Sequence, residues 1–370
     1  MSWSISCWGA GPASCPCGAS RSLLGLTIKG RAMRLKPVGA CLALTGVAGC
    51  LLATGLGLFA NAGYPFELAT HFRYHLAVAS PVLLGLSVVC LSGPLRMAAI
   101  MLVSLLGIVN ASHVVKMPKN VSVQTRSGQQ ESDRTARSLS LIWANVDRKR
   151  EAIAALATLD KAYGADIVAI AEAPYDLTLQ DWASAFADKP HVWLSPPPLR
   201  EHRFPTRIAI ASRYPLEQAR MDQLPQSLQP RAWFEAVFRP ERGEAGAGGG
   251  GLALLFAHPI APDFPGMVKD RNAYIDHVAA RVEQLTMSPD VTSFLLAGDW
   301  NVTPWAPDFT RLPGQRIGDA RLEASWLNRW PLLGLPLDHV MVSKGVEPTD
   351  YRIGPSIGSD HRPVLAKVTW

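Results

Sequence analysis

One uncharged stretch constrains the fold of this chain more than any other feature. Residues 38–60 carry no charged side chain over 23 positions. A helix rises about 1.5 Å per residue, so a stretch of this length can cross the roughly 30 Å of hydrocarbon in a bilayer. We therefore predict a membrane-spanning helix over residues 38–60.

Two more apolar runs follow the first, over residues 76–92 and 97–115. The second run is interrupted by Pro81 and the third contains Asn110 and His113, so a pair of helices buried in a soluble domain is the alternative interpretation. Their position directly after the first span, and the short link between them, favour two further spans. We expect an anchor of three spans, in which Asn110 and His113 lie near the end of the third.

The net charge of +6 belongs to the membrane end of the chain. Residues 1–115 hold seven Lys and Arg against one acid, Glu67, whereas residues 116–370 hold 29 basic and 29 acidic side chains. A sequence pI of about 9.1 would otherwise indicate a nucleic-acid binder. Because the larger part is neutral, the charge does not support that class.

Lys and Arg also predict the orientation of the anchor. Five basic residues and no acid precede residue 37, and Arg96 follows the second run, whereas residues 61–75 carry one basic residue and one acid. By the positive-inside rule the N-terminus lies in the cytoplasm, and three spans place the C-terminal part outside. Lys116 and Lys119 argue for the opposite orientation.

By composition the chain divides into four parts. These are a disordered basic leader over residues 1–36, a three-helix transmembrane anchor over 37–116, a polar linker over 117–138 and a folded domain over 139–370. All six cysteines lie in the first 90 residues, so the folded domain has no thiol and tolerates an oxidising compartment. Cys15 and Cys17 lack the second ligand pair that a zinc site needs.

Within the folded domain, apolar strand patterns outnumber helical ones. Strands are expected over residues 139–146, 166–171, 207–212, 232–238, 252–257, 293–297, 339–343 and 364–368, and helices over 148–163, 178–186 and 267–285. Many strands and few helices favour an α/β (α+β) fold, a four-layered sandwich of two packed mixed β-sheets flanked by helices. The all-α transmembrane anchor precedes it.

Polar side chains with catalytic potential lie at the edges of the last apolar runs. They are Asp299 and Asn301, then Asp338, then Asp360 and His361. Carboxylates at strand ends can converge to hold a divalent cation while an imidazolium faces a phosphate. The C-terminal part therefore predicts a metal-dependent phosphoesterase.

Three earlier residues occupy similar positions: Asn145 and Glu172 end the first two expected strands, and His258 follows a later one. Each has an ordinary alternative. Asn145 could cap the helix after it, Glu172 could be a solvated strand end, and His258 could be a buried structural histidine. Asp299 and Asn301 could likewise form only a turn.

The ordered set of these residues resembles the endonuclease/exonuclease/phosphatase superfamily over about residues 139–370. Members include pancreatic-type deoxyribonucleases, apurinic endonucleases, sphingomyelinases and inositol polyphosphate phosphatases. The run from Gly298 to Trp305 resembles most closely a bacterial branch with three N-terminal spans and an extracytoplasmic catalytic domain, which includes proteins linked to glycopeptide-antibiotic resistance. The resemblance implies a multi-pass protein of the bacterial inner (cytoplasmic) membrane.

The resemblance also implies a metal site. Glu172 matches the family's principal metal ligand, Asn145 matches its first metal-site amide, and Asp360 would lie next to the metal or the attacking water. The implied cofactor is Mg²⁺, with Mn²⁺ as the alternative.

The catalytic roles implied by the resemblance fall on five residues. Asp299 matches the residue that positions or deprotonates the attacking water, and Asn301 matches the amide that orients the phosphate. His361 would stay protonated beside Asp338 and contact a phosphoryl oxygen, because a carboxylate raises an imidazole pKa. His258 matches a second active-site histidine and is interpreted as a phosphate contact.

Three positions lie outside these assignments. Arg207 stands where the family has Gly, so its guanidinium either binds phosphate or faces solvent. Trp300 replaces the common Phe, which is a conservative packing change. His339 points to the other face of its strand from Asp338 and is expected in the core or on the surface.

The substrate stays open between two classes. A membrane anchor through residues 38–115 suits a lipid-linked phosphate, diphosphate or phosphodiester, with a rim of tryptophans available at Trp182, Trp193, Trp305, Trp326 and Trp330. The alternative is an extracytoplasmic nuclease, and a second alternative is a non-catalytic membrane scaffold or sensor. Beyond the bilayer and the phosphate ester, no obligate protein partner is inferred.

Overall fold

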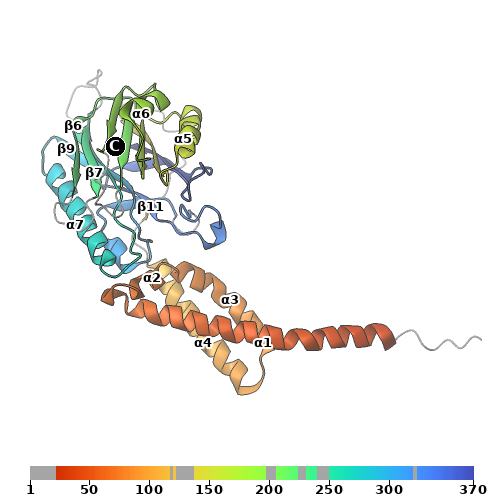
Figure 1. Cartoon of the computed structure of the whole chain (residues 1–370). Coiled ribbons are helices and arrows are strands. Elements are labelled where there is room, and N and C mark those ends of the chain that lie inside the picture. Colours follow the sequence, from red (N-terminus) through yellow and green to blue (C-terminus); the bar gives the residue numbers. More distant parts are fainter. Residues whose placement is uncertain are drawn as a thin grey trace, which may run out of the picture.

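The computed structural model describes residues 22–116, 120–121, 137–196, 206–223, 231–239, 250–319 and 323–370. These residues form a helical N-terminal part and a larger part built on two sheets (Figure 1). Most of the expected leader and most of the expected linker lie outside the described residues.

Three helices form the N-terminal part: α1 (Ser22–Leu58), α3 (Arg73–Cys90) and α4 (Gly93–Val115). Lys36–Leu58 within α1, and the full lengths of α3 and α4, are long and apolar enough to cross a membrane. They coincide with the three apolar runs of the sequence. α1 begins at Ser22, inside the leader that we expected to be disordered up to residue 36, because Leu, Ala, Met, Lys and Arg in that stretch favour helix.

The helical part meets the sheets through one of its ends. Between α1 and α3 the chain forms a short 3₁₀ turn, η1 (Ala60–Ala62), and the helix α2 (Phe66–Thr70). Figure 1 shows α2 next to the sheet-containing part and the turn between α3 and α4 at the opposite end. Val114, near the end of α4, packs in one cluster with Trp305 of the folded domain.

Two mixed sheets make up the folded domain. The first has seven strands in the order β1-β10-β11-β9-β8-β7-β6, and the second has six in the order β12-β13-β2-β3-β5-β4. The strands are β1 Asn120–Val121, β2 Ser138–Asn145, β3 Ile167–Ala171, β4 His191–Leu194, β5 Ile208–Ser212, β6 Glu217–Gln223, β7 Ala232–Phe238, β8 Gly251–Ala257, β9 Val291–Asp299, β10 Gln315–Ile317, β11 Asp338–Val342, β12 Glu347–Ile353 and β13 Val364–Thr369.

The sheets pack face to face over an apolar core and carry helices on their outer faces. Trp143 of the second sheet stacks on Phe256 of the first, and both are fully buried. The outer helices are α5 (Arg150–Tyr163) and α6 (Leu179–Ala185) on the six-stranded sheet and α7 (Met267–Thr286) on the other. The expected four-layered fold is confirmed.

Five strands were not expected from the sequence: β1, β4, β6, β10 and β12. Four of them, β1, β4, β6 and β12, are edge strands, and β10 is next to the edge strand β1. The sequence of β6, EQARMDQ, has little apolar character because one side of an edge strand meets solvent. These strands therefore lack the pattern on which the expectation depended.

Candidate functional site

Strand pairing brings the residues singled out in the sequence to one edge of the two sheets. β2 and β3 run parallel and end together, which places Asn145 beside Glu172. β9 and β11 run antiparallel with Asp299 directly opposite Asp338. Because β8 is parallel to β9, His258, the residue after β8, lies beside Asp299.

Glu172 is held by three neighbours. Asn145 Nδ2 donates to Glu172 Oε1 over 3.2 Å, His258 Nε2 lies 3.1 Å from the same oxygen, and an Arg148 guanidinium nitrogen lies 3.2 Å from Oε2. Burial raises the pKa of Glu172, but His258, Arg148 and Asn145 together hold it well below its ordinary value. Its φ of 52° is left-handed, which costs about 1 kcal/mol for a residue with a Cβ. Strain at this position is typical of a functional residue.

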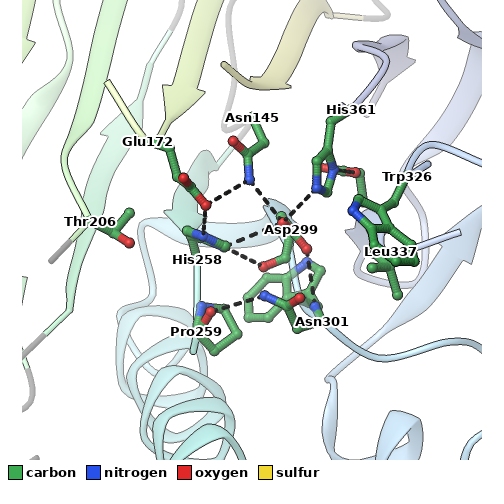
Figure 2. A network of polar contacts seen from close by, with 12 residues as sticks. Asn145, Glu172, Thr206, His258, Pro259, Asp299, Asn301, Trp326, Leu337 and His361 are labelled. Carbon is green, nitrogen blue, oxygen red and sulfur yellow. Dashed lines mark hydrogen bonds and ion pairs between the residues drawn. The ribbon is translucent and has the colours of Figure 1, made fainter. Parts of the chain in front are cut away.

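Asp299 lies at the centre of the site, between residues from both sheets (Figure 2). Its Oδ2 accepts a hydrogen bond from Asn145 Nδ2 over 3.1 Å and lies 3.5 Å from both His258 Nδ1 and His361 Nε2. Its Oδ1 accepts the backbone N–H of Asn301 over 3.2 Å. The Asp299 carboxylate therefore lies against Asn145, Asn301 and both histidines of the site.

The surroundings of Asp299 leave it more basic than an ordinary aspartate. Burial raises the pKa of Asp299, and the charge of Asp338 adds to this, so that the opposing charge of His361 does not restore the ordinary value. Gly298, the residue before Asp299, allows β9 to lie close to Ala257 of β8, since a Cβ at position 298 would lie 2.5 Å from the carbonyl oxygen of Ala257.

His361 and Asp338 form a buried pair. His361 Nδ1 lies 2.7 Å from Asp338 Oδ2, and Trp143 Nε1 donates to Asp338 Oδ1 over 2.9 Å. Burial lowers the pKa of His361, but Asp338 and Asp299 raise it to about 10. His361 is therefore an imidazolium at neutral pH, with Nε2 facing Asp299.

Asn301 and Asp360, two further predicted site residues, form hydrogen bonds with residues outside the predicted set. Asn301 donates from Nδ2 to the carbonyl of Pro259 over 3.1 Å, and its φ is also left-handed. Asp360 is exposed and accepts from Trp326 Nε1 over 3.3 Å. Asp360 lines the same pocket as Glu172, the other predicted carboxylate ligand.

The oxygen donors around Asn145 fit a divalent cation. Carboxylate oxygens of Glu172 and Asp299 both lie within 3.2 Å of Asn145 Nδ2, which brings two carboxylates to one side-chain amide. The amide turns its N–H groups to the carboxylates, and its Oδ1 accepts from the backbone N–H of Asp147. Asp299, Asp338 and His361 also offer ligand atoms within 4.8 Å of one another. That second group suits a cation less well, because Asp338 already accepts from an indole and an imidazole and His361 is protonated. Carboxylate and amide oxygens are the ligands that hard cations prefer.

A pocket of about 340 Å³ opens over these side chains. Its walls come from both sheets and from the segment between α1 and α3. The lining residues are Leu68, His71, Phe72, Asn145, Asp147, Arg148, Glu172, Arg231, His258, Ala261, Pro262, Asp263, Asp299, Asn301, Trp326, Leu335, Leu337, Asp360 and His361. All of the predicted site residues except Asp338 line this pocket, and Asp338 supports His361 from behind.

Sequence reasoning missed several of these lining residues. Arg231 is buried and directly precedes β7, and Arg148 follows Asn145 by three residues. Their positions next to expected strand ends could have suggested them. Leu68 and Phe72 carried no such signal, because only the docking of the anchor brings them to the pocket.

Arg207 has a structural role that neither expectation covered. Its guanidinium is buried and donates to four backbone carbonyls, those of Pro174, Tyr175, Leu177 and Ser195. It therefore binds neither solvent nor the pocket. By fixing the loop after β3 it holds the backbone that follows Glu172.

His339 and the tryptophans singled out in the sequence differ in burial and in their position relative to the pocket. His339 is buried away from the pocket, where burial and Arg316 lower its pKa to about 3, as expected for a core residue. Trp182 and Trp305 are buried, Trp326 lines the pocket and Trp330 is 60% exposed. A continuous tryptophan rim is therefore not present among these residues.

Comparison with protein families identifies the domain. A model described as the Endonuclease/Exonuclease/phosphatase family matches residues 142–361. The chain belongs to this family. Members of the endonuclease/exonuclease/phosphatase family are hydrolases of phosphoester bonds that generally depend on a divalent metal. Comparison with curated proteins gives no match.

Solved structures share the fold at low sequence identity. An endonuclease/exonuclease/phosphatase protein from Bacteroides vulgatus is 13% identical with a TM-score of 0.50, covering 63% of this chain and 98% of that chain. Truncated TDP2 from Caenorhabditis elegans is 16% identical with a TM-score of 0.49, at 63% and 98% coverage. A mannosyl-6-phosphatase from Bacteroides thetaiotaomicron is 15% identical with a TM-score of 0.46, at 63% and 100% coverage. At these identities the likeness concerns the fold alone.

Proposed function

We propose that this protein hydrolyses a phosphoester by direct attack of water on phosphorus, with its catalytic domain held at a membrane. The observation that carries this proposal is the position of Asp299. It is buried, lies between a carboxylate–amide group on one side and an imidazolium on the other, and faces a pocket large enough for a phosphate.

Asp299 acts as the general base in this proposal. Its raised pKa makes it a better proton acceptor than an exposed aspartate, and it lines the pocket in which the attacking water would lie. His361 keeps its proton because of Asp338, so Nε2 can donate to a phosphoryl oxygen as negative charge develops there. No covalent intermediate with the enzyme is needed.

Asn301 and His258 position the substrate and the carboxylates in this proposal. Asn301 faces the pocket from the turn after Asp299 and would orient the phosphate. Both ring nitrogens of His258 are engaged, one with Glu172 Oε1 and one with the carbonyl of Asp299. These contacts support a role in positioning the two carboxylates, in addition to the phosphate contact that the family resemblance implies.

Glu172 and Asn145 are the residues that we propose for Mg²⁺, with Mn²⁺ as the alternative, and Asp360 is a further ligand predicted from the family. A divalent cation bound there would neutralise phosphate oxygens and lower the pKa of a bound water. Glu172 suits this task because its carboxylate is ionised at neutral pH.

We propose that the N-terminus lies in the cytoplasm of a bacterium and that the catalytic domain lies outside its inner membrane. The basic residues support this orientation. Lys36 and Arg96 lie near the end of the anchor that is remote from the catalytic domain, where Leu91 and Ala99 pack together. At the opposite end, Arg73 is buried and bonded to the carbonyl of Trp305.

The decisive experiment measures metal-dependent hydrolysis by the full-length protein in detergent. Plasmid DNA, RNA, a polyprenyl diphosphate, phospholipids and an aryl phosphodiester are each incubated with wild type and with Asp299→Ala. We expect product from at least one phosphoester with wild type and Mg²⁺, and none with Asp299→Ala. A protein that hydrolyses none of them, or a variant as active as wild type, contradicts the proposal.

A further inference from the structure

The segment between the first two apolar helices is bonded to residues 301–305, which follow β9 and are called the catalytic loop. Glu67 of α2 is 1% exposed, and its Oε1 lies 3.0 Å from an Arg271 guanidinium nitrogen. The other guanidinium nitrogen of Arg271 donates to the carbonyl of Asn301 over 2.9 Å. One buried arginine thus joins the anchor to the backbone of a residue in the active-site pocket.

A second set of contacts follows two residues further along the catalytic loop. The backbone N–H of Thr303 donates to His71 Nδ1, and His71 Nε2 lies 3.0 Å from Glu67 Oε1. Trp305 Nε1 donates to the carbonyl of His71 over 2.7 Å, and the Trp305 ring stacks on Tyr74 at 5.7 Å. Bonds at 301, 303 and 305 fix the anchor segment against the catalytic loop.

These polar contacts leave the apolar side chains of the segment facing the pocket. Leu68 and Phe72 line it together with Leu335 and Leu337, which pack against Val114 near the end of α4. Phe72 immediately precedes the span that begins at Arg73 and is 42% exposed. The apolar wall of the pocket is therefore continuous with the membrane-spanning helices.

A polar pocket floor and an apolar wall next to a bilayer suit one kind of substrate. A phosphate head group at the membrane surface would reach Asp299 while its hydrocarbon chain stays in contact with apolar side chains. We infer that Leu68 and Phe72 form a subsite for the hydrocarbon chain of an amphiphilic phosphoester that remains in the bilayer. This inference depends on the proposed phosphoesterase function and names its substrate class.

The test compares two substrates that differ only in their chain, methyl 4-nitrophenyl phosphate and hexadecyl 4-nitrophenyl phosphate. Both release nitrophenol, so one assay follows both with the full-length protein in detergent micelles. Phe72→Ala should lower kcat/KM for the hexadecyl ester about tenfold, mainly through KM, because it removes apolar contact area with the chain. The methyl ester should change less than about twofold.

Two further variants make the result specific. Phe72→Leu keeps an apolar side chain in the wall and should restore most of the activity on the hexadecyl ester. Phe59→Ala removes an exposed phenylalanine of the same linking segment that does not line the pocket, and it should change neither substrate.

The inference is overturned if Phe72→Ala lowers both esters equally, changes neither, or behaves like Phe59→Ala. It is also overturned if wild type shows no preference for the longer chain. If wild type hydrolyses neither ester in the presence of Mg²⁺, the proposed phosphoesterase function itself fails, which is a different result from loss of chain selectivity.

Discussion

The two faces of the pocket are built in opposite ways. The catalytic face consists of polar side chains at strand ends, such as Asp299 and Glu172, with their charges turned toward the pocket. The other face, called the anchor face, comes from the segment between α1 and α3 and turns Leu68 and Phe72 toward the pocket. Its charged residue, Glu67, points away and is buried against the catalytic domain.

The catalytic face carries the groups proposed for the reaction, whereas the anchor face holds the two parts of the protein together. On the catalytic face the fold leaves Asp299 buried with a raised pKa, which costs stability and suits Asp299 to the proton transfer that we propose for it. On the anchor face the buried ion pair with Arg271 stabilises the docked arrangement. Substitutions on the first face should therefore change turnover, and substitutions behind the second face should change stability.

The largest effect is expected at the centre of the catalytic face. Asp299→Asn keeps the shape of the side chain and removes the base, so kcat should fall about 10³-fold on any substrate. The thermal midpoint should stay the same or rise, because a buried carboxylate with a raised pKa is lost. The matched control is Asp290→Asn, at a position whose side chain is 72% exposed. Activity of Asp299→Asn above about a tenth of wild type would remove it from this role.

Metal removal tests the proposed cation site at Glu172, which also belongs to the catalytic face. EDTA should reduce hydrolysis to background, and added Mg²⁺ should restore it without refolding. Glu172→Gln should raise the Mg²⁺ concentration for half-maximal activity at least about tenfold, because a neutral amide binds the cation more weakly. Glu151→Gln, on the exposed side of α5, should leave that concentration unchanged. Activity that persists in EDTA would argue against a metal-dependent site.

Glu67→Gln tests the polar contacts behind the anchor face. Although burial raises the pKa of Glu67, His71 and Arg271 lower it from 4.5 to about 2, a difference worth about 3 kcal/mol. This stabilisation is present above pH 4.5 and is lost as the pH falls toward 2. The thermal midpoint in detergent should be several degrees lower in the variant at neutral pH, and the gap to wild type should close in acid.

The turnover of the Glu67→Gln variant should show that the anchor face affects stability and not catalysis. Well below its thermal midpoint, Glu67→Gln should change kcat on a soluble ester less than about threefold, since Glu67 does not line the pocket. Glu283→Gln, an exposed residue of α7, serves as control and should not alter the midpoint. A loss of turnover as large as that of Asp299→Asn would mean that the two faces are not separable.

The smallest effect is expected from pH in the neutral range. Because the pKa of His361 is raised to about 10, its proton is retained below that pH and is lost above it. The kcat/KM for a soluble ester should therefore change less than about twofold between pH 7 and 9 and should fall about tenfold per unit above pH 10. A decline already between pH 6 and 7 would indicate an ordinary histidine and contradict the buried pair with Asp338.

Much of the catalytic domain followed from local patterns. Interior strands such as β7 and β8 were predicted almost to the residue, because strands buried on both faces are mostly apolar. Edge strands such as β6 and β12 were missed, since their polar sequences carry no such pattern. The helical start at Ser22 was also missed, because the composition of the leader was taken as disordered.

For the site, residue types were predictable and their partners were only partly so. The pairing of His361 with Asp338 was expected from the family resemblance and is present at 2.7 Å. The open question at Arg207 was decided by burial, because its neighbours are four backbone carbonyls far along the chain. The role of Asp360 as a metal ligand stays a prediction, and its side chain accepts a hydrogen bond from Trp326.

The sequence by itself determined the three apolar helices, the family and the set of acidic, amide and imidazole side chains, because these depend on residue type, length and order. The tertiary structure alone decided that the segment around Glu67 and Phe72 becomes part of the catalytic pocket. That outcome depends on pairing Glu67 with Arg271, some two hundred residues later, and no local pattern encodes a contact over such a separation.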